Sequence, residues 1–446
     1  MTSSIHLPRG IYAFRHRNYR LFFAGQATSL IGTWMQQVAQ AWLVLLLTGD
    51  VLWLGVIAAA QFIPVLLLGL PAGVLADALP KRRTLVITQA VKMSLSASLA
   101  VIAITNVESF PLLLGIALAI GTANAFDMPI RQSFVVEMVG REDIGNAVAL
   151  NSAMFNSARI IGPAVAGLLI GAVGIAAAFV IDALSFLAVI GALLLMDERE
   201  LRPAPPIARP HSLGEIRVQL AEGLHYVRRT PLVFIAVVVI GLVSTVALNF
   251  SVIMPAYAKD VLHGDAATYG FLMAASGVGS LLAALWLAFG SGARPRRIAF
   301  GAIALGIGEA ILALSTSIPA SMLIMVGVGF GSITMAASAN TTMQLAVPDN
   351  LRGRVMSVYT TIFAGSTPNG GPNMGAIASV AGIAVSLAIG GLLSVGIGIA
   401  AFARLRRLGL DRPVELPPAT AYASGAPKTS AALRPPNPNE VLSTRS

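Results

Sequence analysis

The chain has 446 residues, of which 56% are hydrophobic and only 11% are charged. A soluble globular protein carries about 25% charged residues, so this composition excludes an ordinary soluble enzyme and a largely disordered protein and favours a bundle of membrane-spanning helices. The net charge is +10 and cysteine is absent, which excludes disulfides, thiolate metal sites and cysteine nucleophiles.

About twelve apolar runs of membrane-spanning length follow one another along the chain. Such runs are typical of transmembrane helices, and equal numbers of them stand on each side of a polar segment at residues 197–231. They cover residues 19–47, 51–76, 84–105, 110–126, 147–170, 176–196, 232–257, 268–289, 298–316, 320–345, 355–377 and 383–402. We therefore expect an all-α membrane protein.

The positive residues gather in alternate loops. If both termini lie on one side of the membrane, all but three of the 30 lysines and arginines belong to that side or its tails, the exceptions being Lys92, Arg159 and Lys259. Loops rich in lysine and arginine stay in the cytoplasm, so we expect a multi-pass protein of the bacterial inner membrane with both termini cytoplasmic. The basic excess is then a topology signal, and no nucleic-acid partner is expected.

These patterns divide the chain into five segments. They are a cytoplasmic N-terminus (1–18), an N-terminal six-helix bundle (19–196), a cytoplasmic linker with an amphipathic helix (197–231), a C-terminal six-helix bundle (232–403) and a disordered cytoplasmic tail (404–446). A weak repeat relates the two halves, because Phe155 and Gly162 are separated from Phe363 and Gly370 by the same offset. Paired halves with a binding site between them are a common transporter plan.

Longer strings stand out in and beside the apolar runs. They are residues 18–26 (NYRLFFAGQ), 32–36 (GTWMQ), 73–83 (GVLADALPKRR), 124–132 (NAFDMPIRQ), 158–163 (ARIIGP) and 347–357 (VPDNLRGRVMS). Together they resemble the major facilitator superfamily, in the branch of bacterial exporters that includes the enterobactin exporter, the transmembrane secretion effectors. The resemblance implies the major facilitator fold, with twelve transmembrane helices in two six-helix bundles around a central cavity. It also implies secondary active export of drug-like or siderophore-like small organic molecules by alternating access and proton-linked antiport.

Two motifs of this resemblance imply gating. Gly73 and Asp77 resemble the Gly-x-x-x-Asp signature of the superfamily, although residues 78–80 depart from it, and Gly162 with Pro163 resembles the fifth-span signature of antiporters. The expected gating and conformational residues are Gly73, Asp77, Arg82, Arg83, Asp127, Arg131, Gly162, Pro163, Arg352 and Arg354. Topology-setting charge and ordinary packing of small residues are the alternative explanations.

Polar side chains recur on one face of the first span, at Gln26, Thr33, Gln37 and Gln40. Polar groups within a bilayer need partners or water, and the first span of the family fold lines the cavity. The expected cavity residues are Gln37, Gln40, Gln61, Asn151, Phe155, Arg159, Asn249, Asn340 and Tyr359. Hydrogen bonding between helices is the alternative for the polar ones.

Four ionisable residues fall inside the apolar runs, and such residues are functional hypotheses by default. Lys92 and Asp182 lie near the starts of their runs and could reach an interface by snorkelling, whereas Arg159 and Glu309 lie near the midplane. We expect Arg159 to contact an anionic group or a gate, with bonding to helix carbonyls as the alternative. The candidate proton sites are Glu309 and Asp182, although the ninth span of this fold is peripheral.

No lysine follows a glycine, so the chain has no P-loop and is expected to be a transporter and not an enzyme or a nucleotide-driven pump. We expect no cofactor and no metal. The expected partners are a small-molecule substrate, a proton or other ion gradient and the lipid bilayer, with the chain acting as a monomer. Because residues 112–126 lack the arginine of drug/proton antiporters, an uptake symporter or facilitator stays open. The other open classes are a membrane-embedded lipid-modifying enzyme and a transport-inactive sensor.

Overall fold

A computed structural model describes residues 9–107, 109–202, 213–289 and 294–412, and the regular structure within these ranges is helical. The expected proline-rich part of the linker and most of the expected tail lie outside the described residues. The helices are η1 (Arg9–Arg15), α1 (Arg17–Thr48), α2 (Val51–Ala78), α3 (Lys81–Thr105), α4 (Phe110–Val173), α5 (Ile175–Leu194), η2 (Glu198–Glu200), α6 (Leu213–Arg229), α7 (Pro231–Val246), α8 (Phe250–Ala256), η3 (Tyr257–Val261), α9 (Ala266–Phe289), α10 (Arg296–Leu312), α11 (Ile318–Ala346), α12 (Asp349–Ala381) and α13 (Ile383–Arg407).

The prediction of twelve membrane helices is confirmed. Among the described residues, nine helical stretches are long and apolar enough to cross a membrane. One of them, α4, holds two spans that meet at Gly140, where φ is +75°. The short helix α10 and the polar, proline-containing helix α12 supply the remaining two spans. A run of α7, α8 and the π-helical η3 forms a single span, interrupted near Asn249.

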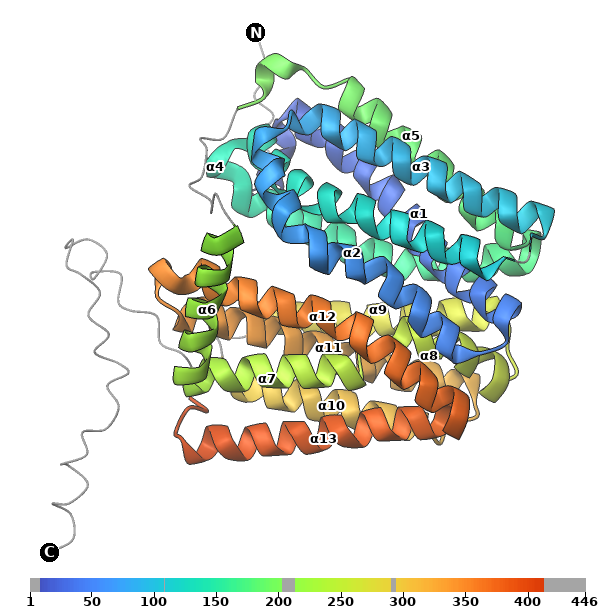
Figure 1. Cartoon of the computed structure of the whole chain (residues 1–446), viewed down its shortest axis with the longest axis vertical. Coiled ribbons are helices and arrows are strands. Elements are labelled where there is room, and N and C mark those ends of the chain that lie inside the picture. The colour runs from blue at the N-terminus through green and yellow to red at the C-terminus, as the bar shows by residue number, and fades with distance from the viewer. Residues whose placement is uncertain (1–8, 108, 203–212, 290–293, 413–446) are drawn as a thin grey trace, which may run out of the picture.

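Figure 1 shows the helices as two bundles, α1–α5 in the upper half of the view and α7–α13 in the lower half. The bundles converge at the end of the molecule where α2 and α8 meet, and their helices diverge toward the end that carries α6. The α6 helix packs against α7 and α12 of the C-terminal bundle. The connection between the halves therefore crosses the end at which the bundles are spread.

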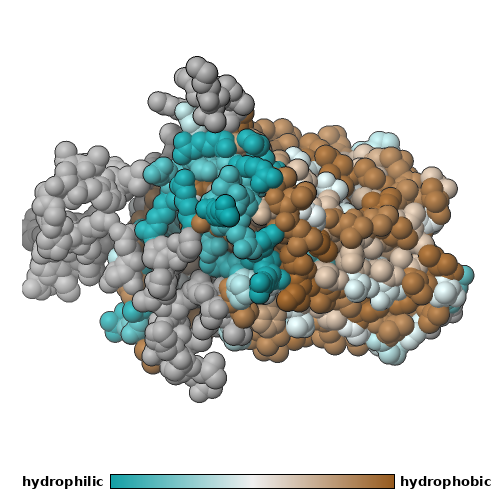
Figure 2. Space-filling view, turned by 90° about the horizontal axis from the view of Figure 1, so that it is seen from above, coloured by the Kyte–Doolittle hydropathy of each residue, from teal (hydrophilic) through white to brown (hydrophobic). Residues whose placement is uncertain are grey.

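The surface matches this arrangement. Figure 2 shows polar side chains gathered at the α6 end, while apolar side chains cover most of the remaining surface on this face. Large side chains along the helices are strongly exposed, for example Leu323 of α11 at 75% and Leu67 of α2 at 67%. Such exposure is costly in water and favourable in lipid. The chain is therefore a multi-pass membrane protein.

The two halves repeat a backbone feature as well as a sequence pattern. Gly174 separates α4 from α5 and Gly382 separates α12 from α13, each with φ +98°. A side chain is strained in this region of φ, whereas glycine enters it freely. The offset between these glycines equals that between Phe155 and Phe363. The repeat expected from two weak matches therefore includes the turn before the last span of each half.

Two details differ from the expected boundaries. The C-terminal bundle was expected to end at residue 403, but α13 continues to Arg407. Arginines in a last turn interact favourably with the negative end of the helix dipole, which explains the extension. The run expected over 355–377 contains two prolines, and α12 nevertheless continues through Pro368 and Pro372 to Ala381. Neighbouring helices tolerate proline within membrane spans because freed backbone groups find other partners.

Glycines let the helices of the C-terminal bundle touch backbone to backbone. A Cβ atom added to Gly329 of α11 would overlap the backbone of Ser276 on α9, and one added to Gly279 of α9 would overlap Val326 on α11. These contacts bring the two helix axes close together. No comparable contact surrounds Gly327, which lies on the same helix as Gly329 and faces open space.

We predict that Gly329→Ala lowers the stability of the purified protein by about 1–3 kcal/mol, because overpacking forces the helices apart. The matched substitution Gly327→Ala should raise stability slightly, since alanine is the better helix former. Thermal unfolding followed in detergent by size-exclusion chromatography measures both changes. Equal melting temperatures for the two variants would contradict the close contact between α9 and α11.

Candidate functional site

An aromatic and cationic cluster joins α1 to α4 in the N-terminal bundle. The guanidinium carbon of Arg159 lies 6.0 Å from the centre of the Trp34 ring, and the Phe155 ring meets Trp34 edge-on at 5.6 Å. The lack of a side chain at Gly162 leaves room for Trp34, because a Cβ atom at position 162 would lie 2.5 Å from the Cβ atom of Trp34. Among the described residues, no carboxylate lies within ion-pair distance of Arg159. The cation is therefore held by a π face.

A second aromatic pair occupies the corresponding place in the C-terminal bundle. The rings of Tyr359 and Phe363 on α12 stack with centroids 6.1 Å apart. Tyr359 also hydrogen-bonds to Asn340 of α11, whose oxygen accepts a bond from Gln344. Phe363 is 40% exposed and its repeat partner Phe155 is 47% exposed. Each half thus presents one open phenylalanine beside a polar or cationic group.

The two bundles touch each other along α4 and α9. A Cβ on Gly167 of α4 would lie 2.8 Å from the carbonyl oxygen of Ala266 on α9, and one on Gly270 would lie 3.0 Å from Cα of Gly167. Gly270 also faces the carbonyl oxygen of Pro163, the second residue of the expected antiporter motif. That motif therefore lies where the two halves of the protein meet.

A matching contact joins α2 to α12. A Cβ on Gly371 of α12 would lie 3.5 Å from Cα of Gly55 on α2, and one on Gly375 would lie 2.9 Å from the carbonyl of Val51. Both α2 and α9 begin at the end of the molecule opposite α6, and these contacts involve their first turns. Backbone contacts therefore close the end of the protein that is remote from the linker.

Two of the expected cavity glutamines lie in a network between helices. Gln40 is buried and its side-chain oxygen accepts bonds from Gln36 at 2.6 Å and from Gln61 of α2 at 2.8 Å. These bonds correspond to the helix–helix alternative for Gln40 and Gln61. Gln37 is exposed and lines a small pocket with Gln61.

Like Asn340, the other two expected asparagines bond within the protein. Asn151 accepts a bond from the hydroxyl of Tyr19 at 3.1 Å, which ties α4 to α1. Asn249 is buried at the break between α7 and α8, and its amide donates to the carbonyl of Thr245 at 2.8 Å. Both side chains are therefore used in bonds within the protein, whereas Phe155 is exposed.

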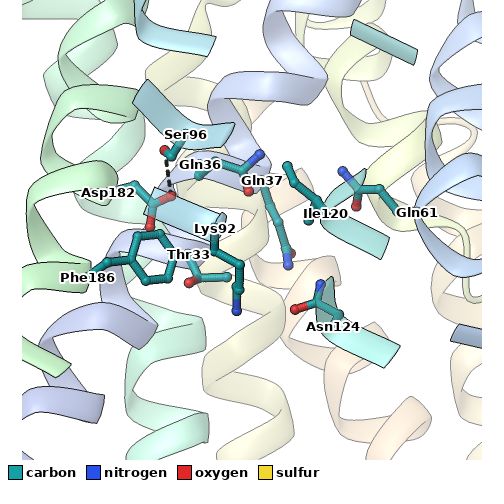
Figure 3. A pocket seen from close by; sticks show the side chains of 10 residues that line it. All are labelled: Thr33, Gln36, Gln37, Gln61, Lys92, Ser96, Ile120, Asn124, Asp182 and Phe186. Atoms are coloured by element: carbon teal, nitrogen blue, oxygen red, sulfur yellow. Dashed lines mark hydrogen bonds between the residues drawn. The ribbon is translucent and has the colours of Figure 1, made fainter. Parts of the chain in front are cut away.

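A small polar pocket lies inside the N-terminal bundle, apart from the aromatic clusters (Figure 3). Lys92 of α3 and Asp182 of α5 both line it and both are buried, so neither side chain takes the snorkelling position that the sequence allowed. Ser96 donates a hydrogen bond to Asp182 at 2.8 Å. The pocket is lined by Thr33, Gln36, Gln37, Gln61, Lys92, Ser96, Ile120, Asn124, Asp182 and Phe186.

The expected gating pair Asp127 and Arg131 is part of the interior of the same bundle. The Asp127 carboxylate is fully buried, forms an ion pair with Arg131 one turn along α4, and accepts bonds from Thr88 at 2.9 Å and Gln89 at 2.6 Å. Both donors come from α3. This network joins α3 to α4 and balances the charge of a carboxylate that has no access to water.

The basic loop after α2 binds the first residues of the linker. Arg82 donates to the carbonyl oxygens of Leu193 and Leu194 at 2.6 and 2.9 Å and forms an ion pair with Glu198. It therefore satisfies carbonyls at the end of α5, where positive charge is favourable. Lys81 forms a similar pair with Glu137 of α4.

The remaining residues of that expected motif lie on α2 and in the first turn of α3. Gly73 is half-buried on α2, and Arg83 is exposed. Asp77 lies in the last turns of α2, but its side chain falls outside the described residues. The expected gating role of Asp77 therefore stays a prediction.

The equivalent arginines of the C-terminal half contact the linker helix. Arg354 of α12 forms an ion pair with Glu222 of α6 at 2.5 Å, and Gly223 of α6 sits against the backbone of Arg354. Arg352 donates to the carbonyl of Val347 at 3.4 Å. Arg82 and Arg354 therefore hold opposite ends of the same linker.

The second expected proton site lies elsewhere. Glu309 of α10 is buried against α13, where a Cβ on Gly390 would lie 3.2 Å from the carboxyl oxygen Oε2. Among the described residues, that oxygen has no hydrogen-bond partner. The surrounding helices all belong to the C-terminal bundle, so Glu309 does not face the contact between the halves.

Comparison with known proteins agrees with this geometry. The family described as transmembrane secretion effector matches residues 10–415. The chain belongs to this family of major facilitator transporters. It is similar to the multidrug efflux pump Tap of Mycolicibacterium fortuitum, with 29% identity over 398 residues that cover 86% of this chain and 95% of that protein. It is also similar to the staphyloferrin A transporter of Staphylococcus aureus, with 26% identity over 271 residues that cover 60% and 66% of the two chains.

Solved structures share the fold at low identity. A POT family transporter in complex with 5-aminolevulinic acid superposes with a TM-score of 0.70 at 12% identity, covering 90% of this chain and 99% of that one. An inward-facing bacterial homologue of the lysosomal transporter Spinster gives a TM-score of 0.66 at 13% identity over 89% and 97% of the two chains. The family identifies a membrane transporter, and these structures show its fold.

Sequence reasoning missed part of the polar pocket. Gln36, Ser96 and Asn124 were not expected to act together, and Lys92 and Asp182 were considered one at a time. A signal was present, since α3 and α5 each place a charge and a hydroxyl within four residues, Lys92 with Ser96 and Asp182 with Ser185. Pairing those two helices required the tertiary structure.

We predict that Asp127→Asn and Arg131→Gln each destabilise the protein by about 3–5 kcal/mol, because each leaves the other member of a buried pair without its partner. The double variant should lose less than the sum of the two single losses, since neither charge is then left unpaired. Thermal unfolding of the purified variants measures all three. Arg83→Gln, at an exposed position, should stay within about 0.5 kcal/mol of wild type, and additive losses at positions 127 and 131 would contradict the pairing.

Proposed function

We propose that this transporter exports small organic molecules across the bacterial inner membrane by alternating access, coupled to proton antiport. The observation that carries the proposal is the one-sided contact between the bundles. Glycines close the end remote from α6, while the helices diverge at the other end. A carrier that exposes its binding site to one side at a time needs a closed end of this kind.

The positive residues orient this state in the membrane. The basic loop after α2, the linker and the end of α13 all lie at the spread end of the bundles. Because basic loops remain in the cytoplasm, we assign that end to the cytoplasm, with both termini. The closed end then faces the periplasm, and the state is one that receives cargo from inside the cell.

The side chains available to cargo support organic molecules. Phe155 and Phe363 are partly exposed, and each belongs to a helix, α4 or α12, that contacts the other half of the protein. Aromatic faces bind apolar and planar groups. Arg159 provides one positive charge near Phe155, which favours cargo that is neutral or carries an anionic group. Multidrug efflux and staphyloferrin A transport, named for two relatives, fit this combination.

Transport by everted membrane vesicles tests the function and its direction. Vesicles that contain the protein are loaded with acidic buffer and given, in separate assays, an anionic and a cationic fluorescent dye. We expect accumulation of dye in the acidic lumen, because antiport moves dye inward as protons leave, and loss of accumulation on adding a protonophore. Loss of preloaded dye from the acidic lumen, driven by protons that leave in the same direction, would refute export and identify an uptake symporter.

We predict that Gly167→Leu abolishes transport, because a leucine cannot fit between α4 and the backbone of α9. The closed end then fails to form, and the opposite state is favoured. Spin labels at Leu79→Cys and Leu408→Cys, on the α6 ends of the two bundles, should report shorter distances than in the unsubstituted background. The absence of native cysteine makes both labels unique.

Gly115→Leu is the matched control for this experiment. It places the same side chain on α4, at a position where the structure leaves open space. We expect wild-type transport and wild-type spin-label distances. Loss of transport in both variants would show that leucine on α4 is harmful by itself, and the role given to the Gly167 contact would then be rejected.

A further inference from the structure

We propose that Lys92 and Asp182 form a proton-exchange site inside the N-terminal bundle, separate from the aromatic residues that meet the cargo. The inference rests on the proposed function in one respect, the coupling of transport to protons. It assigns the coupling to the polar pocket shown in Figure 3, whose walls come from all five helices of the N-terminal bundle.

The pocket holds two buried charged groups that are not paired with each other. Asp182 is 2% exposed and Lys92 is 8% exposed. Among the described residues, no carboxylate lies within ion-pair distance of the Lys92 ammonium, which lies 5.4 Å from the centre of the Phe186 ring. Ser96 bonds to one oxygen of Asp182, and the other, Oδ1, has no hydrogen-bond partner among the described residues. Such an oxygen is free to accept a proton.

The size and the charge of the pocket determine what can occupy it. The cavity measures about 30 Å³, room for roughly two water molecules, so it excludes the organic cargo. A metal cation in the pocket would lie close to the Lys92 ammonium, and two positive charges at short range repel each other. A proton adds no volume and binds covalently to the carboxylate. Water and a proton therefore fit the pocket, whereas cargo and metal cations do not.

The other elements around the site contribute no further free charge. Helix α1 supplies Thr33, Gln36 and Gln37, and α2 supplies Gln61, all uncharged. Helix α4 supplies Asn124, and its nearest charges are the mutually paired Asp127 and Arg131. Lys92 is therefore the charge that faces Asp182 within the pocket. When Asp182 is ionised, the two charges cancel. When its carboxylate binds one proton that enters from bulk solution by way of the pocket water, the pocket carries +1.

This change of charge occurs beside the helix that carries the aromatic cluster. A Cβ on Gly32 of α1 would lie 2.9 Å from Oδ1 of Asp182, so α1 packs directly on the atom that takes the proton. Trp34, which holds Arg159 and Phe155, follows two residues later. The neutral carboxyl and the carboxylate attract Lys92 differently, and α1 is positioned to transmit that difference to the cargo site.

Infrared difference spectroscopy of the full-length protein in lipid tests the site directly, with bulk pH as the only variable. We expect a carboxylic C=O band that appears on acidification and is absent from Asp182→Asn. Lys92→Met should move the pH at which this band appears. A band that survives in Asp182→Asn, or one that disappears in Glu309→Gln instead, would overturn the proposal.

Dye transport in the same variants separates this proposal from the proposed function. We expect Asp182→Asn to lose accumulation driven by a pH gradient, while dye-for-dye exchange without a gradient, which needs no proton, continues. Asp182→Glu should restore part of the gradient-driven accumulation. If Asp182→Asn retains gradient-driven accumulation, the site is refuted and export stands. If the wild-type protein moves no dye, the spectroscopy still decides whether Asp182 exchanges a proton.

Discussion

The contact of glycine with backbone across the two bundles is the interaction on which the rest of the structure depends. At Gly55, Gly167, Gly270 and Gly375, helices of opposite halves approach until a single added carbon would overlap the backbone of the facing helix. Lipid provides no hydrophobic drive between helices, so close packing must supply the association. Such contacts form over short distances and are lost together, which suits an end that must close firmly and open again.

A second constraint acts inside each bundle. Polar groups removed from water must find partners within the protein. Gln40 receives two bonds from neighbouring glutamines, and Asp127 receives two bonds and an ion pair. The Lys92 ammonium has no carboxylate within ion-pair distance, and Oδ1 of Asp182, like Oε2 of Glu309, has no hydrogen-bond partner among the described residues. Ionisable groups left in this state inside a membrane protein indicate a function.

The basic residues that set the topology also hold the linker. Arg82 pairs with Glu198 at its beginning, and Arg354 pairs with Glu222 at its helix. Both pairs are partly exposed, so each contributes little to stability. Their value lies in position, because they attach one linker to both halves at the end where the bundles are spread. In the proposed orientation, the same charges both set the topology and connect the halves.

The sequence by itself determined the number and order of the helices, because an apolar run long enough to cross a bilayer has few alternatives to a helix. It also determined the repeat and the family. It left open what each expected cavity residue does, since Gln40 and Phe155 look equally suited to line a cavity. Only the tertiary structure decided that Gln40 bonds between helices, that Phe155 stays open, and that Lys92 and Asp182 share one pocket. The reason is physical: a span is specified by local hydrophobicity, whereas a site is specified by which helix faces meet, and that depends on packing between distant parts of the chain.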